Sequence, residues 1–445
     1  PHSRFVRFLA RLSLALVTLV SGACVPDDGP AGNPGSAPDT LEIVPGGRGS
    51  ASQTAAEVQT ARGLWVLAEG GVRVLDDPLA RLPALMARAR RLGASDLFVQ
   101  VYRGGRAFYR AGPDIERAPA VDRLEAEGID ALSLLLDAAG AQGLRVHAWV
   151  NALSLSTRAD AQLIDRLGRE AILVDRRGRS LLDYPGFDVP SPDRRYYRMG
   201  TRGLYLDPGL PVVREHLASL FADLLARYPA LDGLHLDYIR HPGVLPFSPG
   251  SRFGVGLEFG YGEASRAIYR AETGAPDPID GAAQGTVRSP TGWDDWRRDQ
   301  VTRLVETIAA RVRDVAPRTI LSAAVIAYSD RAYLSLAQDW RRWLEDGAID
   351  LAIPMVYTLD DRLLRYQLES YAGWPDAERV WPGLGVWLFD EDPARAIAQV
   401  EQLRRLGFAG EVLFSDDALA GAPALVAALV SSAPALAAPS KAPSQ

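Results

Sequence analysis

The chain has 445 residues, with 49 Lys and Arg against 55 Asp and Glu, a net charge of −6 and a hydrophobic fraction of 47%. This apolar content is enough for a large core and excludes a mainly disordered chain, and the acidic balance argues against a protein that binds nucleic-acid phosphates. The only lysine, Lys441, lies in the C-terminal tail, which rules out Schiff-base aldolases, pyridoxal phosphate enzymes and P-loop nucleotide hydrolases because each needs a lysine at its site.

The first 24 residues have the layout of an export signal. Arg4, Arg7 and Arg11 precede an apolar run at residues 12–20, which is too short to span a bilayer stably. Small residues then lead to the chain's only cysteine, Cys24. The segment therefore resembles a bacterial lipoprotein signal, in which Cys24 is acylated and becomes the mature N-terminus. The alternative is an ordinary cleaved signal with an incidental cysteine.

Two flexible segments flank the predicted domain. Residues 25–60 are rich in Gly, Pro, Ala, Ser and Asp without periodicity, which is typical of a tether, and residues 431–445 form an Ala/Pro/Ser-rich tail. Val25 follows the cysteine where an aspartate would indicate retention in the inner membrane, so we expect an outer-membrane or cell-surface lipoprotein. Without the lipid, the protein would be periplasmic or secreted. The lipid anchor is the only membrane contact that we predict, and the sequence does not indicate an oligomeric state.

Between these segments, residues 61–430 contain eight alternations of a short apolar run with a longer segment of helical periodicity. The predicted strands are Gly63–Glu69, Asp96–Tyr102, Arg145–Asn151, Gly233–Arg240, Thr319–Ile326, Ile349–Tyr357, Val380–Phe389 and Glu411–Ser415. The predicted helices are Leu79–Leu92, Ile129–Gln142, Pro211–Tyr228, Trp293–Val315, Tyr333–Glu345, Arg362–Tyr371, Ala394–Leu406 and Pro423–Val430. This alternation predicts one α/β domain, a single (β/α)8 TIM barrel, rather than two open sheets.

Two of the loops after the predicted strands are long. They cover residues 152–210 after strand three and residues 241–292 after strand four. The active sites of such barrels lie in the loops at the carboxyl ends of the strands, so we expect these two loops to raise one wall of a cleft. Both loops are rich in Tyr and Phe, whose rings pack either on sugars or on one another.

Strand four provides the main catalytic candidate. His235 and Asp237 are two residues apart, so they share one face of the strand, and their polarity predicts that this face points to the barrel axis. A carboxylate at the last inward position is costly unless it is paired or functional, which makes Asp237 a catalytic candidate. The alternative is a structural ion pair between Asp237 and Arg240 or His147.

Strand three supplies further polar candidates on one face. His147 is the deepest of them and has the position of a core histidine, whereas Trp149 can stack on a sugar and Asn151 can bind a hydroxyl group. The residues that we predict to bind substrate are Trp149, Asn151, His235, Arg240, Tyr357 and His147.

Three carboxylates at other strand ends are candidate partners of Asp237. They are, in order of preference, Glu69 after strand one, Asp416 after strand eight and Asp390 after strand seven. Acidic residues just before a helix commonly act as caps, and Asp390 fits that role because Pro393 opens the next helix.

Other chemistries fit these residues less well. Because Cys24 is the only cysteine, the folded part has no thiolate zinc site and no cysteine nucleophile, and a metal hydrolase built on His147, His235 and Asp237 would take its ligands from two strands only. Acidic loops after strands seven and eight would repel a phosphate, and no G-x-S-x-G motif supports a serine triad. We therefore predict carboxylate chemistry on a neutral, hydroxyl-rich substrate, with no metal and no cofactor.

The same strand-end segments resemble the glycosyl hydrolase-like 10 family of bacterial envelope proteins. The resemblance extends from Arg62 to about Leu419 and rests on residues 62–66, 98–101, 147–151, 206–209, 232–242, 296–298 and 354–357. It implies a glycosidase-like (β/α)8 barrel that acts on polysaccharide, with peptidoglycan glycan strands as the favoured substrate, and its strand-four motif falls on Asp237. The chain departs from the family at Tyr238 and at Arg106, where many relatives have an aspartate.

We therefore predict an exported glycoside hydrolase that places two carboxyl groups across an oxocarbenium-like transition state, with Asp237 as one of them. The competing hypothesis is an inactive, glycan-binding barrel lipoprotein that has lost the second carboxylate. A metal-dependent hydrolase is the third alternative.

Overall fold

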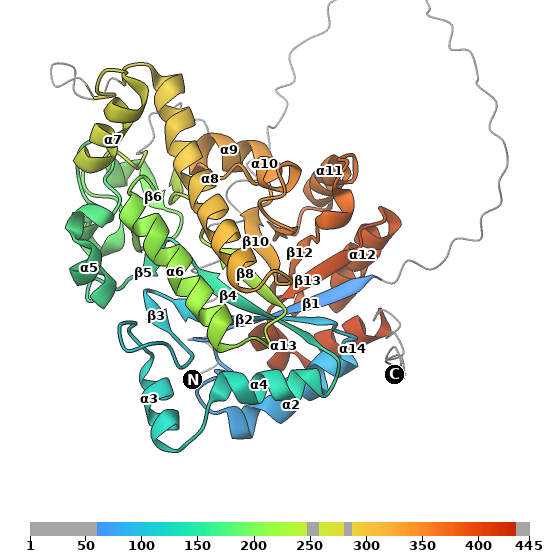
Figure 1. The fold of residues 1–445 in the computed structure, drawn as a ribbon. Coiled ribbons are helices and arrows are strands. Elements are labelled where there is room, and N and C mark those ends of the chain that lie inside the picture. The colour runs from blue at the N-terminus through green and yellow to red at the C-terminus, as the bar shows by residue number, and fades with distance from the viewer. Residues whose placement is uncertain (1–59, 247–257, 280–286, 433–445) are drawn as a thin grey trace, which may run out of the picture.

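The computed structural model describes residues 60–246, 258–279 and 287–432. Parallel strands close into a barrel because β1 pairs with both β2 and β13, which confirms the predicted (β/α)8 TIM barrel (Figure 1). Its eight strands are β1 (Ala61–Val66), β2 (Asp96–Arg103), β4 (Arg145–Asn151), β8 (Gly233–Asp237), β10 (Ile320–Ile326), β11 (Leu351–Val356), β12 (Gly383–Gly385) and β13 (Gly410–Phe414). A short strand, β3 (Arg106–Ala107), extends β2 as a hairpin.

Helices surround the barrel in Figure 1. They are α2 (Pro78–Arg91), α3 (Pro119–Ala126), α4 (Ala131–Gly140), α5 (Gln162–Leu167), α6 (Pro211–Arg227), α7 (Glu263–Thr273), α8 (Pro290–Val315), α9 (Ser329–Leu336), α10 (Trp340–Glu345), α11 (Asp361–Ala372), α12 (Pro393–Arg405), α13 (Asp416–Ala420) and α14 (Pro423–Ser431). Six of them, α2, α3, α6, α8, α12 and α14, begin with proline, whose fixed φ and missing N–H suit the first helical turn. Within the described ranges, no helix combines the length and the apolar composition needed to cross a membrane.

The predicted export signal, Cys24, all but the last residue of the predicted linker and most of the predicted tail lie outside the described residues. These predictions therefore stay predictions.

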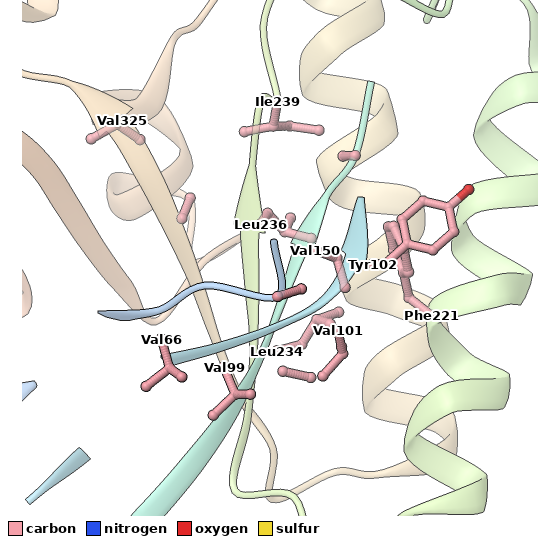
Figure 2. Packing of buried hydrophobic residues seen from close by; sticks show 14 of the residues in the cluster. Val66, Val99, Val101, Tyr102, Val150, Phe221, Leu234, Leu236, Ile239 and Val325 are labelled. Carbon is pink, nitrogen blue, oxygen red and sulfur yellow. The ribbon is translucent and has the colours of Figure 1, made fainter. Parts of the chain in front are cut away.

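The alternation of side chains along the strands builds two separate cores. Outward residues such as Val66, Val99 and Leu236 pack against the helices, where Figure 2 shows Phe221 of α6 beside the strands. Inward residues fill the barrel with a second cluster, which includes Trp65, Phe98, Trp149, Ile353, Tyr357 and Val412. The barrel is therefore a packed core rather than a pore, and substrate can approach only at its ends.

The two long loops, which the sequence predicts to form one wall of a cleft, contact each other. The loop after β4 contains β5 (Ser154–Ser156), α5, β6 (Tyr197–Met199) and β7 (Leu204–Tyr205), and the loop after β8 contains β9 (Val244–Pro246) and α7. Strands β6 and β9 pair and so join the loops, and Ser265 of α7 donates a hydrogen bond to the buried Asp207 over 2.8 Å. Tyr184 and Phe259 contact each other across the two loops, with ring centroids 6.3 Å apart. The sequence allows these loop rings to pack either on sugars or on one another, and the structure shows the second for Tyr184 and Phe259.

Four predicted elements differ from the observed ones. The strand predicted over 63–69 is β1, which ends at Val66, so Glu69 lies beyond the strand. Strand β8 ends at Asp237 rather than Arg240, because Tyr238 adopts a φ of 52° and turns the chain out of the sheet. Of the strand predicted over 380–389, Gly383–Gly385 form β12, Val380 forms an isolated bridge with Ala352, and residues 386–389 form a 3₁₀ turn. The helix predicted over 333–345 is two helices, because Ala337 between them has a φ of 54°.

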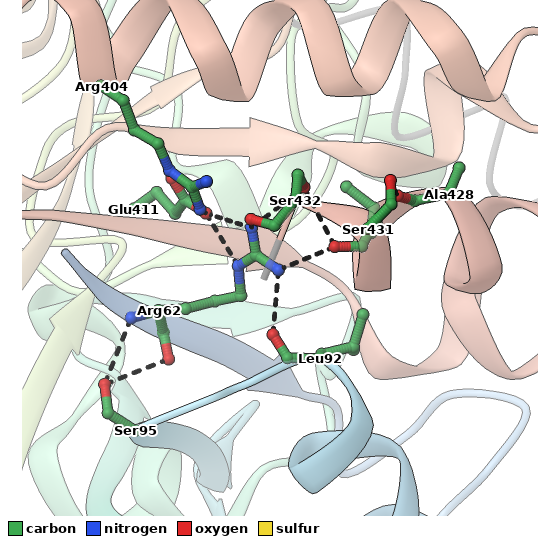
Figure 3. A network of polar contacts seen from close by, with 9 residues as sticks. Arg62, Leu92, Ser95, Arg404, Glu411, Ala428, Ser431 and Ser432 are labelled. Carbon is green, nitrogen blue, oxygen red and sulfur yellow. Dashed lines mark hydrogen bonds and ion pairs between the residues drawn. The ribbon is translucent and has the colours of Figure 1, made fainter. Parts of the chain in front are cut away.

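A buried arginine joins the first strand to the end of the chain. Arg62 of β1 is fully buried and forms an ion pair with Glu411 of β13 at 2.6 Å. Its guanidinium also donates to the backbone carbonyls of Leu92, Leu429 and Ser432 (Figure 3). This network fastens α2 and α14 to the two strands that complete the barrel.

We predict that Arg62→Met lowers the free energy of unfolding by about 3 kcal/mol, because Glu411 stays buried without its closer cation. Urea unfolding measures this change. The control is Arg362→Met, at a side chain that is 92% exposed, for which we expect less than about 0.5 kcal/mol. Equal effects of the two substitutions would contradict the structural role of Arg62.

Candidate active site

Asp237 is the last residue of β8 and lies beside Asn151 of β4 in the parallel register. Its side chain is buried, with 6% of the residue exposed. One carboxylate oxygen accepts a hydrogen bond from the indole Nε1 of Trp149 over 3.1 Å, and the other accepts from the backbone N–H of Tyr238 over 2.6 Å. The carboxyl group is thus fixed at the carboxyl ends of two adjacent barrel strands.

Burial raises the pKa of Asp237 above the ordinary value of an aspartate. Four interactions favour the charged form and oppose this rise: the charges of Arg240 and Arg103 and the two hydrogen bonds. Desolvation outweighs them, so the carboxyl group keeps its proton to a higher pH than an exposed aspartate does. A protonated carboxyl group near neutral pH is what a general acid requires.

The residue after Asp237 has an unusual backbone conformation. Tyr238 adopts the left-handed conformation, with a φ of 52°, which costs a non-glycine residue energy and is often kept where function needs it. Its ring lies 6.2 Å from that of Tyr205, and the guanidinium of Arg240 lies 5.1 Å from its centroid. The turn therefore brings Arg240 back over the strand end, close enough for its charge to act on Asp237.

Four aromatic rings surround the carboxyl ends of the strands. Tyr357 lies 4.8 Å from Trp387 and 5.6 Å from Phe414, and Phe414 lies 6.3 Å from Trp149. Trp387 and Phe414 are only partly buried. Burial raises the pKa of Tyr357 well above its usual range, and the nearby charge of Asp237 adds to the rise. Trp387 and Phe414 thus offer partly exposed apolar faces of the kind that pack on sugars, whereas Trp149 and Tyr357, which the sequence predicts to bind substrate, are buried in the same cluster.

An amide pair joins β2 to β4 next to this site. Gln100 of β2 is buried and donates a hydrogen bond from Nε2 to the Oδ1 of Asn151 over 3.1 Å. The Oε1 of Gln100 accepts from the backbone N–H of Ala68 over 3.4 Å. Gln100 therefore orients the predicted hydroxyl ligand Asn151. Our sequence analysis missed this role, although Gln100 is the inward polar residue of a strand and that pattern could have indicated it.

Glu69 shares a cationic neighbour with Asp237. Its side chain is 44% exposed and forms an ion pair with Arg103, at the end of β2, over 3.5 Å. The charge of Arg103 also acts on Asp237. The structure thus connects Glu69 and Asp237 through one arginine, which the sequence analysis did not single out.

The other two candidate carboxylates lie elsewhere. Asp416 is fully buried and accepts two hydrogen bonds, of 2.6 and 2.7 Å, from Arg88 of α2. Asp390 is exposed at the end of the 3₁₀ turn and precedes α12. Asp416 is thus held to an outer helix by Arg88, and Asp390 faces solvent without a contact to the site. The geometry therefore favours Glu69 among the three predicted partners.

Both predicted histidines lie below this site, inside the barrel. His147 bonds through Nε2 to Asp96 over 2.8 Å and stacks on Phe98, with centroids 4.5 Å apart, as a core histidine does. His235 is fully buried, and burial lowers its pKa well below the usual value, followed by the charge of His147.

Protein groups occupy both ring nitrogens of His235. Nε2 accepts from the indole of Trp65 over 3.1 Å, so Nδ1 carries the proton and donates it to Ser322 over 2.9 Å. These partners support a core role for His235 rather than the predicted contact with sugar.

Two further features bear on the alternatives. Among residues 60–246, 258–279 and 287–432, no group of three or more His, Cys, Asp and Glu side chains is arranged to hold a metal ion. A cavity of about 450 Å³ lies between α5 and α6, and Tyr102, Glu116 and His216 are among its lining residues. Its lining does not include Asp237 or the four rings, so the cavity is separate from the carboxyl site.

Comparisons with known proteins identify the family and the fold. The sequence profile described as glycosyl hydrolase-like 10 matches residues 60–375. The chain is 25% identical to glycosyl hydrolase DigH of Escherichia coli, over 72% of the chain and 70% of that protein. It is 23% identical to glycosyl hydrolase YngK of Bacillus subtilis, over 61% of the chain and 48% of that protein.

The fold is also similar to that of a solved glycoside hydrolase domain. The PgaB (BpsB) domain from Bordetella bronchiseptica superposes with a TM-score of 0.58 over 83% of this chain and 98% of that domain. The two sequences are 17% identical, so this likeness shows the fold.

We predict that Trp149→Phe raises the pKa of Asp237 further, because the substitution removes a hydrogen bond that favours the carboxylate. Carbon-13 NMR of labelled aspartate side chains measures this titration, with the Asp237→Asn variant to assign the signal. Trp387→Phe is the control, since Trp387 contacts Tyr357 and Phe414. A lower pKa of Asp237 in Trp149→Phe, or equal changes in both variants, would contradict the claim that the Trp149 hydrogen bond stabilises the carboxylate.

We also predict that Asp416→Asn lowers the free energy of unfolding by about 3 kcal/mol, because Arg88 loses a buried bidentate partner, and leaves the titration of Asp237 unchanged. Urea unfolding and the same NMR titration measure the two effects. The matched control is Asp390→Asn, at an exposed carboxylate, with an expected change below about 0.5 kcal/mol. A shifted titration of Asp237 in Asp416→Asn would place Asp416 in the site after all.

Proposed function

The chain belongs to the glycosyl hydrolase-like 10 family, and from this premise we propose that it is a glycoside hydrolase that cleaves a polysaccharide of the cell envelope. The observation that carries the proposal is the carboxyl group of Asp237, which is buried among aromatic rings at the carboxyl ends of the barrel strands. This is the end of the barrel where such enzymes hold their catalytic residues.

Asp237 acts as the general acid in this mechanism. Burial raises its pKa and so favours the protonated form, and it gives its proton to the glycosidic oxygen as the bond to the sugar breaks. The N–H groups of Trp149 and Tyr238 then stabilise the carboxylate that remains. Both donors are already in place before the reaction, so little reorganisation is needed.

Glu69 is the second carboxylate of the proposal. Its side chain is partly exposed to water and forms an ion pair with Arg103. It either activates a water molecule or attacks the sugar carbon itself, depending on its distance from Asp237. A separation of about 5–5.5 Å gives retention of configuration and one of about 6.5–9.5 Å gives inversion.

The sugar rings pack on the partly exposed rings of Trp387 and Phe414, which the buried rings of Trp149 and Tyr357 support. These rings exclude water from the reacting bond, and Asn151, held by Gln100, binds a hydroxyl group of the substrate. We propose peptidoglycan glycan strands as the substrate and an outer-membrane or cell-surface location. The predicted export signal and lipidation of Cys24 support this choice.

A glycan-binding protein without activity is the second candidate. It is favoured by Tyr238, which stands where many relatives have an aspartate. The second position at which the chain departs from the family is Arg106. It forms an ion pair over 3.0 Å with Glu116, and Glu116 is a lining residue of the separate cavity. If the missing aspartates are part of the catalytic machinery, substrate still binds and no bond is cleaved.

The test is the release of reducing ends by the full chain from peptidoglycan with and without stem peptides and from a panel of neutral glycans. We expect Asp237→Asn to lower kcat/KM by about 10²–10⁴-fold, the usual contribution of a positioned acid, and Glu69→Gln to lower it markedly as well. Asp390→Asn is the matched control and should keep the wild-type rate.

Full activity of Asp237→Asn would overturn the role of this residue. Silence of the wild type on every substrate, together with binding to one glycan, would establish the second candidate instead.

A further inference from the structure

Glu69, the second carboxylate of the proposed mechanism, lies in a segment without regular secondary structure. Residues 67–72 follow β1 and belong to no strand or helix, so no ladder of backbone hydrogen bonds fixes their path. The ion pair of Glu69 with Arg103 joins two partly exposed side chains, and such pairs contribute little to stability. On one side of Glu69, the backbone N–H of Ala68 donates to Gln100 over 3.4 Å. The position of Glu69 therefore depends on what holds the other side.

Asp417 holds the other side of this segment. It lies in the first turn of α13, the short helix after β13, and its Oδ1 accepts a hydrogen bond from the backbone N–H of Val72 over 2.8 Å. The backbone N–H groups of Leu67 and Gly71 also favour the charged form of Asp417. One carboxyl group thus faces backbone donors from both ends of residues 67–72.

The glycine next to Glu69 allows this close approach. A Cβ atom at Gly70 would lie 2.5 Å from the Cγ of Asp417 and 2.8 Å from its Oδ2, and closer still to its Oδ1. The three nearest atoms all belong to Asp417. Any side chain at position 70 would therefore displace either the carboxyl group or the segment that carries Glu69.

The arrangement leaves part of the Asp417 carboxyl group unsatisfied. Its Oδ2 is buried and has no hydrogen-bond partner among the described residues. Burial raises the pKa of Asp417, the charge of Asp416 adds to the rise, and the backbone N–H groups oppose it. A buried oxygen without a partner costs free energy. Such a cost beside a candidate active site is more typical of a functional group than of one that only stabilises the fold.

We propose that Asp417 is a positioning residue, which fixes residues 67–72 through their backbone N–H groups and so places the carboxylate of Glu69 for the reaction. This inference rests on the proposed function, in which Glu69 is the second carboxylate. Asp417 lies beyond residues 60–375, the part of the chain that the family profile matches. The two adjacent aspartates then have separate roles, because Asp416 pairs with Arg88 of an outer helix and Asp417 holds the segment at the site.

A purely structural role for Asp417 makes a different prediction. If Asp417 only stabilised the fold, its loss would change the rate by the same factor whether or not Glu69 is present. If it acts through Glu69, its loss has little effect once Glu69 has been replaced. A double-mutant cycle on the rate therefore separates the two roles.

The cycle uses the full chain and the glycan, peptidoglycan or a neutral glycan of the panel above, that the wild type cleaves. We expect Asp417→Ala to lower kcat by about 10–100-fold and to change KM by less than about threefold, because a small displacement of a catalytic group mainly affects the chemical step. In the Glu69→Gln background, the same substitution should change kcat by less than about twofold. Asp417→Asn, which keeps an acceptor for the N–H of Val72, should retain more activity than Asp417→Ala.

The matched control is Asp416→Asn, which should keep the wild-type kcat at temperatures where it is folded. A wild-type kcat in Asp417→Ala, or an equal loss in both backgrounds, would overturn the proposal. If Asp417→Ala fails to fold, Gly70→Ala tests the same contact from the other side. It should lower kcat in the wild type and change it by less than about twofold in Glu69→Gln, and an equal loss in both would refute the positioning role.

Amide hydrogen exchange separates this proposal from the proposed function, since it needs no hydrolysis. Asp417→Ala should speed exchange at the amide of Val72 by about 10-fold or more and leave the amide of Val99 in β2 unchanged. Unchanged exchange at Val72 would refute the hold of Asp417 on the segment, even in an active enzyme. Faster exchange at Val72 in a protein that cleaves no glycan would confirm this hold while the proposed function fails.

Discussion

The site depends on the burial of one carboxyl group. Asp237 lies at the end of β8 with N–H donors from Trp149 and Tyr238 and no ion pair to a cation among the described residues. Charge in such a place is stabilised less than it would be in water, so the proton is held more tightly. The two N–H donors and the charges of Arg240 and Arg103 oppose this effect of burial and favour the carboxylate.

The rest of the barrel keeps Asp237 in place. The register of β4 beside β8 places Trp149 and Asn151 next to it, and the column of His235, Trp65 and Phe98 fills the space below. Since that column is neutral and its hydrogen bonds are largely satisfied, it supports the site without competing for its substrate. At the outer layer, Arg62 fastens the first strand to the last and so completes the barrel.

Much of the fold follows from local patterns, whereas the site depends on contacts between distant residues. Alternating apolar runs and helical periods predict the barrel, and inward polarity identifies Asp237, Trp149 and Asn151. The pairing of Glu69 with Arg103 exists only because β1 and β2 are neighbours in the closed sheet. Nothing local distinguishes Asp416, which Arg88 holds, from a catalytic carboxylate. Similarly, a left-handed tyrosine has no sequence signal of the kind that a glycine provides.

The central claim is that the bond to be cleaved lies at Asp237. The most direct measurement is a crystal structure of the Asp237→Asn variant with a bound oligosaccharide of the glycan that the wild type cleaves or binds. The account predicts that the glycosidic oxygen lies about 2.6–3.2 Å from the substituted side chain, with sugar rings on Trp387 and Phe414. An oligosaccharide bound in the cavity beside Tyr102, or one whose glycosidic oxygen is out of reach of position 237, would contradict it.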